Sequence, residues 1–168
     1  MIYIYNDYAG THSTAMAAAY HLNKLPTGRT LTKAEILDID YFNKLTNHDM
    51  GRIIFHGVDE DENSVYTLGR KNDKLVVPAL KNLSEILQDV YHGEDRIVFS
   101  NTSPTVPFAM TMGGLFSRRL KFDFIGVPLL VLGAKQCYPT IIQLVEYTKQ
   151  AGRSAKTKVV IIENKSFN

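Results

Sequence analysis

The chain has 168 residues and a mass of 18.9 kDa, the length of one domain, so we expect a single domain over residues 1–168. Its 45% hydrophobic and 21% charged residues exclude a disordered chain, a collagen-like repeat and a coiled coil. Nineteen basic against seventeen acidic residues give a net charge of +2. This balance predicts binding neither to nucleic acid nor to a membrane surface, but it is compatible with a small anion.

The single cysteine, Cys137, excludes an internal disulfide and a thiolate zinc site and suits a reducing compartment. The first residues, MIYIYNDY, lack the basic start and the long apolar run of a signal peptide. The continuous apolar runs are shorter than the ~18 residues of a membrane helix. We therefore expect a cytoplasmic protein.

The N-terminal half of the chain alternates short apolar runs with longer segments. Strands are predicted at residues 1–5, 52–56 and 64–68, and an alanine-rich helix at residues 13–22. An acidic turn joins the last two strands, which predicts an antiparallel hairpin. Residues 23–51 have the least regular pattern, and we interpret them either as a lid or as a long connection.

The C-terminal half repeats the alternation of strands and helices. Strands are predicted at residues 96–100, 127–132 and 158–163, and helices at residues 78–91, 106–120 and 140–150. The first of these helices has one apolar face, formed by Leu80, Leu83, Ile86, Leu87 and Val90. Strands that are apolar throughout are typical of burial on both faces. The sequence thus predicts an α/β fold: a doubly wound, mainly parallel sheet of about five strands, with one antiparallel hairpin, in a three-layer sandwich.

In such sheets ligands bind beyond the carboxyl ends of the strands. Polar segments follow four predicted strands, at residues 6–14, 56–63, 101–105 and 133–138, and we expect them to meet at this edge. In the first segment Gly10 allows a tight turn, and Ser13 or Thr14 can cap the helix that follows. The free N–H groups and the dipole of that helix favour an anion, most often a phosphate. The alternative is an ordinary turn with a helix cap.

His12 lies at the start of the same helix, where an imidazole is pushed towards its neutral form. Beside bound phosphate, a neutral imidazole can accept a phosphoryl group or act as an acid-base catalyst. The alternative is that His12 only hydrogen-bonds a neighbouring loop. The candidate ligand-binding residues are Asn6, Asp7, Gly10, Thr11, Ser13, Thr14, His56, Asn101, Ser103 and Arg118.

Arg118 is included because arginine binds phosphate with two parallel hydrogen bonds, although an exposed solubilising charge is the alternative. The histidines and aspartates show no metal-ligand spacing, so no metal site is predicted. The residues identify no cofactor and no oligomeric state.

The loop departs from a Walker A sequence, since Tyr5 stands where the first glycine would be and Thr11 where the lysine would be. The spacing of residues 8–14 is also similar to the pyrophosphate loop of ATP pyrophosphatases. A second hypothesis is therefore a nucleotide-binding hydrolase or transferase with a degenerate phosphate loop, in which Arg118 or Arg119 neutralises phosphate charge. A third is a non-catalytic interaction module.

The stretches GTHSTAMAAAYHL and SPTVPFAMTMGGLFSRRL resemble mannose-type phosphotransferase-system IIA domains. This resemblance implies that His12 is a phosphocarrier histidine and that a phosphocarrier protein, as well as a small phosphorylated ligand, is a possible partner.

A second resemblance covers most of the chain. The stretches YNDYAGTHSTAMAAAYHL, VDEDENSVYTLGRK, FSNTSPTVPFAM and GGLFSRRL are similar to a small family of uncharacterised proteins of spore-forming Gram-positive bacteria (Firmicutes). The family is known only as a domain of unknown function, so this resemblance implies no activity.

Overall fold

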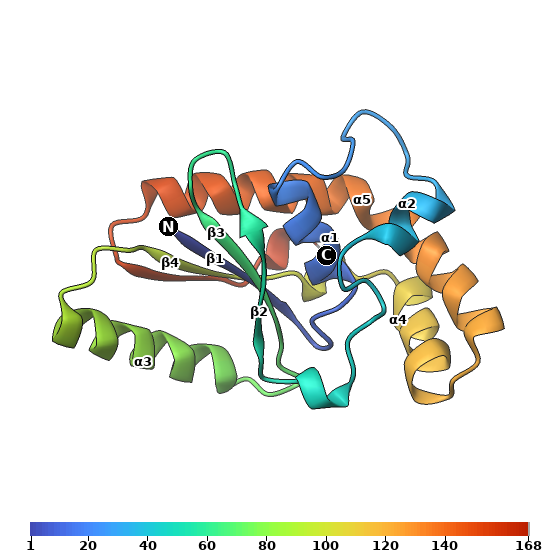
Figure 1. Cartoon of the computed structure of the whole chain (residues 1–168), viewed down its shortest axis with the longest axis horizontal. Helices are drawn as coiled ribbons and strands as arrows, with labels where there is room; N and C mark the ends of the chain where they lie inside the picture. Colours follow the sequence, from blue (N-terminus) through green and yellow to red (C-terminus); the bar gives the residue numbers. More distant parts are fainter. Residues whose placement is uncertain (168) are drawn as a thin grey trace.

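Five strands form one mixed sheet in the computed structural model, which describes residues 1–167 (Figure 1). They are β1 (Ile2–Asp7), β2 (Ile53–Val58), β3 (Ser64–Gly69), β4 (Ile97–Asn101) and β5 (Val159–Ile162). Their order is β2-β3-β1-β4-β5, and all neighbours are parallel except β2 and β3, which form an antiparallel hairpin. The predicted α/β fold and its hairpin are confirmed.

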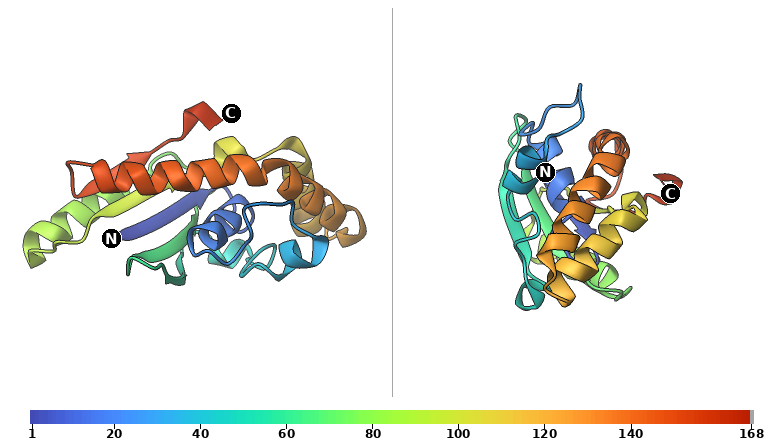
Figure 2. Two further views of the ribbon diagram at one scale, coloured as in Figure 1. Left: turned by 90° about the horizontal axis from the view of Figure 1, so that it is seen from above. Right: turned by 90° about the vertical axis from the view of Figure 1, so that its right-hand side faces the viewer.

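Helices pack on both faces of the sheet (Figure 2). They are α1 (Ser13–His21), α2 (Lys33–Asp38), α3 (Val76–Tyr91), α4 (Phe108–Gly114) and α5 (Asp123–Ser154), and a π-helical turn, η3 (Leu115–Arg119), follows α4. On one face Tyr5 and Val65 belong to a core that is shared with α1 and α5. On the other face Ile4 and Phe99 pack with Val77 of α3. The alternation of side chains along β1 therefore fills two cores, one on each face.

The predicted strand at residues 127–132 is wrong, because these residues belong to α5, together with the helix predicted at residues 140–150. Within the run VPLLVL, Leu130 and Val131 are buried in the core, whereas Leu132 is exposed. An apolar run of this length fits a buried strand and a buried helix equally well. By length and composition alone α5 could cross a membrane, but long core helices share these properties, and the buried side of α5 packs against α1 and α4.

Glycines bring α4 and η3 unusually close to the first half of α5. A Cβ atom on Gly133 would lie 2.6 Å from the backbone nitrogen of Met110, and one on Gly126 would lie 2.4 Å from that of Ser117. The helix predicted at residues 106–120 is therefore divided into α4 and the η3 turn, which is fixed against α5. This packing sets the position of Arg118, which lies in η3.

A buried polar chain ties the turn of the β2–β3 hairpin to α1. The hydroxyl of Tyr5 and Nδ1 of His21 lie 2.8 Å apart, and Nε2 of His21 lies 2.9 Å from Oδ2 of Asp59. Asp59 also accepts hydrogen bonds from the backbone and side-chain amides of Asn63. Burial raises the pKa of Asp59, but the hydrogen bonds from Asn63 and His21 outweigh this effect and lower it to about 2. Asp59 is thus a structural carboxylate.

Candidate functional site

The carboxyl ends of β1, β3 and β4 lie side by side at one edge of the sheet. Asp7 pairs with Gly69 of β3, and Asn6 pairs with Asn101 of β4. From β1 the chain leads through α1 and the hairpin to β3 on one side, and β4 lies on the other side of β1. Such a change of winding direction is where ligands bind in open α/β sheets.

Two of the four polar segments expected at this edge meet there. The hydroxyl groups of Ser13 and Thr102 are 2.8 Å apart, and the backbone nitrogen of Thr102 donates to the carbonyl oxygen of Asn6. These contacts join the loop after β1 to the segment after β4, as the sequence predicted.

The other two segments lie elsewhere. Because β2 is antiparallel, the turn at residues 56–63 lies at the opposite edge, where Val58 pairs with Ser64 at the start of β3. His56 lies within β2, and its Nε2 is 3.0 Å from the hydroxyl of Thr67. Residues 133–138 are part of α5. The expectation that all four segments meet is therefore wrong, and His56 is not brought to the loop after β1.

The carboxylate of Asp7 occupies part of the predicted anion cradle. It accepts hydrogen bonds from the backbone amides of Ala9 and Gly10 and from the hydroxyl of Ser13. Gly10 has a φ of +69°, the left-handed conformation that this tight turn requires. Burial raises the pKa of Asp7, and these hydrogen bonds oppose the rise. The protein's own carboxylate thus binds the amide of Gly10, one of the residues predicted to bind a phosphate, and the amide of its neighbour Ala9.

Residues 41–45 cover the loop from the other side. The hydroxyl of Thr11 donates to the carbonyl oxygen of Tyr41, and the backbone nitrogen of Asn43 donates to the carbonyl oxygen of Thr11 at 3.2 Å. The backbone nitrogen of Leu45 also donates to the Thr11 hydroxyl. Thr11 therefore holds this part of the irregular segment 23–51 in place, and its side chain does not face an open cradle.

His12 is buried, with 7% of its surface exposed, and its ring meets that of Phe42 edge to face. Its Nε2 is 3.2 Å from Oδ1 of Asn43, whose Nδ2 donates to the hydroxyl of Ser117. Because the Asn43 oxygen faces His12, we assign the ring proton to Nε2 and the lone pair to Nδ1. Burial, with a smaller contribution from Arg118, lowers the pKa of His12 to about 4, so the ring is neutral at pH 7.

Three features next to His12 leave polar groups unsatisfied. Within residues 1–167, Nη1 of Arg118 and Oγ1 of Thr14 are buried and have no hydrogen-bond partner. The first amides of any helix have no partner within the helix. In α1 no side chain of the described part of the chain caps them. Burial lowers the pKa of Arg118, and the carboxylate of Asp7 opposes this.

The remaining predicted residues line the edge of the sheet. Asn6 accepts a hydrogen bond from Nε of Arg70 at 2.9 Å. Asn101 donates to Glu163 and accepts from the backbone nitrogen of Ser103, which is exposed. Asn6 and Asn101 therefore stabilise the ends of β1 and β4, and both side-chain oxygens are already engaged.

Sequence reasoning missed Asn43 and Ser117, which connect His12 to Asp123. The hydroxyl of Ser117 donates to the carboxylate of Asp123 at the start of α5. Asn43 lies in the segment with the least regular pattern, so no local signal pointed to it.

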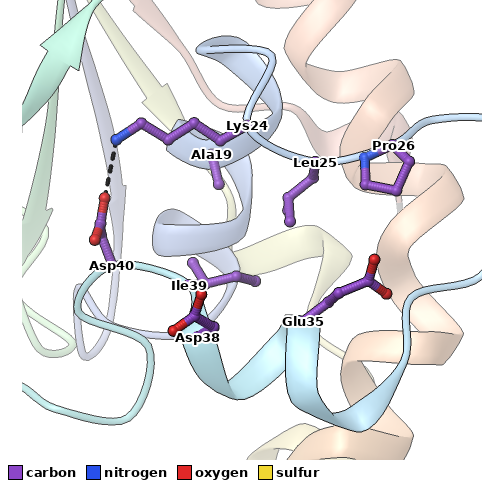
Figure 3. Close-up of a pocket in the computed structure, with 8 residues that line it drawn as sticks. All are labelled: Ala19, Lys24, Leu25, Pro26, Glu35, Asp38, Ile39 and Asp40. Carbon is purple, nitrogen blue, oxygen red and sulfur yellow. Dashed lines mark hydrogen bonds and ion pairs between the residues drawn. The ribbon is translucent and has the colours of Figure 1, made fainter.

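An open pocket lies away from this edge, between the end of α1 and α2 (Figure 3). Three of its four charged residues are engaged: Lys24 forms an ion pair with Asp40 at 2.9 Å, and Glu35 is paired with Arg29. Over residues 1–167 there is no group of three histidine, cysteine or acidic side chains that could hold a metal ion. We therefore consider the edge next to β1, and not this pocket, as the candidate site.

The fold and this edge define the chain as an α/β protein with a mixed five-stranded sheet and a buried polar cluster where the winding changes direction. The chain belongs to the family DUF3189, described as a protein of unknown function, which matches residues 2–150. The predicted resemblance to a domain of unknown function is confirmed. No curated protein and no solved structure matches the chain, and the resemblance to mannose-type IIA domains stays a prediction.

Proposed function

We propose that the protein binds a small phosphorylated molecule between the loop after β1 and the η3 turn, and that His12 acts there as an acid-base group or as a phosphoacceptor. The observation that carries this proposal is Nη1 of Arg118, which is buried without a hydrogen-bond partner among residues 1–167. The charge of Arg118 acts on both His12 and Asp7, so the unpartnered group belongs to this cluster.

An anion would satisfy several groups of this cluster together. An unpaired buried donor costs about 1–3 kcal/mol, and a phosphate oxygen that accepts from Arg118 recovers this energy. The uncapped N-terminus of α1 adds amide donors and the positive end of the helix dipole. Because Asp7 already binds the amides of Ala9 and Gly10, the anion binds on the Arg118 side of the loop.

The assigned tautomer of His12 supports a chemical role. The hydrogen bond to Asn43 holds the proton on Nε2 and leaves the lone pair on Nδ1 available to accept a proton or a phosphoryl group. Gly114 lies on this side of the ring, where a Cβ atom would be 3.3 Å from Cε1 and 3.7 Å from Nδ1. A side chain at position 114 would therefore contact the ring next to the reactive nitrogen, which the glycine avoids.

The binding proposal is tested by thermal denaturation with inorganic phosphate, sugar phosphates and ATP with magnesium. A ligand at 100 times its Kd stabilises the native state by about 2.7 kcal/mol, which raises the melting temperature by roughly 5–10 °C. We expect such a shift with a phosphorylated compound in the wild type and in Arg119→Met, whose arginine is exposed. We expect it to be lost in Arg118→Met. Equal shifts in both variants, or none with any compound, would contradict the proposal.

The role of His12 is tested with a phosphocarrier protein charged from phosphoenolpyruvate. Acid-labile label on the wild type and on His48→Gln, but not on His12→Gln, is expected for a phosphoacceptor; His48 is exposed and is a matched control. ATP turnover that survives in His12→Gln would favour the nucleotide-binding alternative. If no label appears but phosphorylated compounds still bind, His12 is confined to binding or acid-base chemistry.

A further inference from the structure

A chain of three hydrogen bonds leads from the ring of His12 to a carboxylate at the surface. Nε2 of His12 lies 3.2 Å from Oδ1 of Asn43, and Nδ2 of Asn43 lies 2.9 Å from the hydroxyl oxygen of Ser117. The hydroxyl of Ser117 in turn donates to Asp123. His12 and Ser117 are buried, whereas Asp123 is exposed in the first turn of α5. We call these three bonds the relay.

One direction of the relay satisfies every group in it. Asp123 lies in the first turn of α5, where a negative charge is favoured, and a carboxylate has no hydrogen to donate. The single hydroxyl hydrogen of Ser117 must therefore point to Asp123, and the Ser117 oxygen must accept from the NH2 group of Asn43. This turns the oxygen of Asn43 towards His12. Because that oxygen can only accept, the ring must carry its hydrogen on Nε2.

The opposite direction leaves one contact without a hydrogen. With its hydrogen on Nδ1, His12 would need the Asn43 amide to turn round and donate to Nε2. The oxygen of Asn43 would then need the hydroxyl hydrogen of Ser117, and the oxygens of Ser117 and Asp123 would face each other with no hydrogen between them. The loss of one such hydrogen bond makes this arrangement roughly tenfold rarer or more.

We propose that Asp123 is a positioning residue for His12: through Ser117 and Asn43, its carboxylate fixes the ring as the Nε2–H tautomer and keeps the lone pair on Nδ1. Asp123 contacts neither the ring nor Arg118 through a hydrogen bond or ion pair in the described chain, so it acts only through the relay.

The consequence of this arrangement for chemistry rests on the proposed function. Ser117 and Arg118 are consecutive residues of η3, so the turn that would hold the anion also orients the ring. The nitrogen that accepts a proton is then fixed before a ligand binds, and no reorientation of the ring is needed during the reaction. The tautomer itself does not depend on any ligand.

The test reads the tautomer of His12 by 15N NMR at pH 7, on protein labelled with 15N-histidine. Ring nitrogens with and without a hydrogen have widely separated 15N signals, and His12→Gln identifies the signals that belong to His12. We expect wild-type His12 to carry its hydrogen on Nε2 and none on Nδ1. The exposed His48 serves as an internal reference and should show the averaged signals of a solvated imidazole.

Two variants release the constraint at different points of the relay. The amide in Asp123→Asn can donate as well as accept, so both directions of the relay become possible. Ser117→Ala removes the link between Asn43 and the carboxylate. In each variant the ratio of the Nε2–H to the Nδ1–H tautomer should fall by roughly tenfold. Asp49→Asn is the matched control, because the charge of Asp49 also acts on Arg118 but its carboxylate binds outside the relay; it should keep the wild-type ratio.

A wild-type His12 with its hydrogen on Nδ1, or a tautomer ratio that neither Asp123→Asn nor Ser117→Ala changes, would overturn the inference. If one variant fails to fold, the other decides. Because the measurement needs no ligand, it is separate from the test of the proposed function. A fixed Nε2–H tautomer in a protein that binds no phosphorylated compound would support the relay and contradict only the proposed function.

Discussion

Lowering the pH from 7 to 4 should destabilise the folded protein strongly, because two buried histidines must be neutral in the folded state. Burial lowers the pKa of His12 and of His56 to about 4, from an ordinary value of 6.5. Between these values the unfolded chain binds protons that the folded chain does not. The free energy of unfolding therefore falls as the pH falls, by up to about 1.4 kcal/mol per pH unit for each histidine.

The two histidines together remove up to roughly 3 kcal/mol per pH unit, a large fraction of the 5–15 kcal/mol that stabilises a typical domain. Two other groups also change how the free energy of unfolding depends on pH. Burial raises the pKa of Asp7, so the folded state takes up a proton more readily there and recovers part of the loss. The pKa of His21 is also lowered to about 4, because burial outweighs its hydrogen bond to Asp59, so this third histidine adds to the loss of stability at low pH.

The measurement is urea unfolding at a series of pH values between 7 and 4. His56→Gln should reduce the slope of the unfolding free energy against pH by up to about 1.4 kcal/mol per pH unit, the contribution of one proton. The amide can keep a hydrogen bond to Thr67 but does not titrate. His48→Gln should leave the slope unchanged, because His48 is exposed. A wild-type unfolding free energy that stays constant from pH 7 to pH 4 would show that these imidazoles are not held neutral.

Replacing Gly10 with alanine should cost about 3 kcal/mol or more of unfolding free energy, the second large effect that we expect. Gly10 has a φ of +69°, and a left-handed backbone costs alanine about 1–2 kcal/mol. A Cβ atom at this position would also lie 2.5 Å from the backbone nitrogen of Gly69 and 2.9 Å from its Cα. Because both are backbone atoms, the loop after β1 must move away from the end of β3 to relieve the clash.

Thermal and urea unfolding of Gly10→Ala can be compared with Gly28→Ala, a control on an exposed loop where a Cβ atom would meet nothing within 4 Å. The control should change the unfolding free energy by less than about 0.5 kcal/mol. Gly10→Ala should also disturb the loop amides that bind Asp7 and so weaken any ligand binding at Arg118. Equal stability of the two variants would mean that the loop does not depend on this conformation.

The sequence predicted those parts of the fold whose local pattern and tertiary environment agree. The run at residues 1–5 became β1 because a β-branched and aromatic strand is buried on both faces, and the acidic turn before Ser64 joined β2 to β3 as expected. The strand predicted at residues 127–132 failed because a short apolar run fits a helix as well as a strand, and the exposed Leu132 gave no polar signal. Similarly, the apolar residues predicted along one face of the helix at residues 78–91 have a helical spacing, but four of the five are exposed. Periodicity does not show whether an apolar helix face meets the core or the solvent.

The candidate site was predictable only where it follows directly from a strand. The loop from Asp7 to Thr14 could be identified because a polar turn between a strand and a helix has a fixed place in this type of fold. The partners of His12 could not be predicted, because Asn43 comes from an irregular segment and Ser117 from a π-helical turn that packs closely against Gly126. The Asp7 side chain was predicted as a ligand contact, whereas it binds the loop itself.

The course of α5 has a consequence for any ligand held near Arg118. The helix contains Pro128 and Pro139, and Figure 1 shows that it changes direction along its length, as helices do at proline. Its C-terminal part lies along the sheet, and its N-terminal part pairs with α4 and η3. Because Gly126, just before Pro128, packs against Ser117, the direction of this part of α5 helps to place the neighbouring Arg118 relative to the sheet.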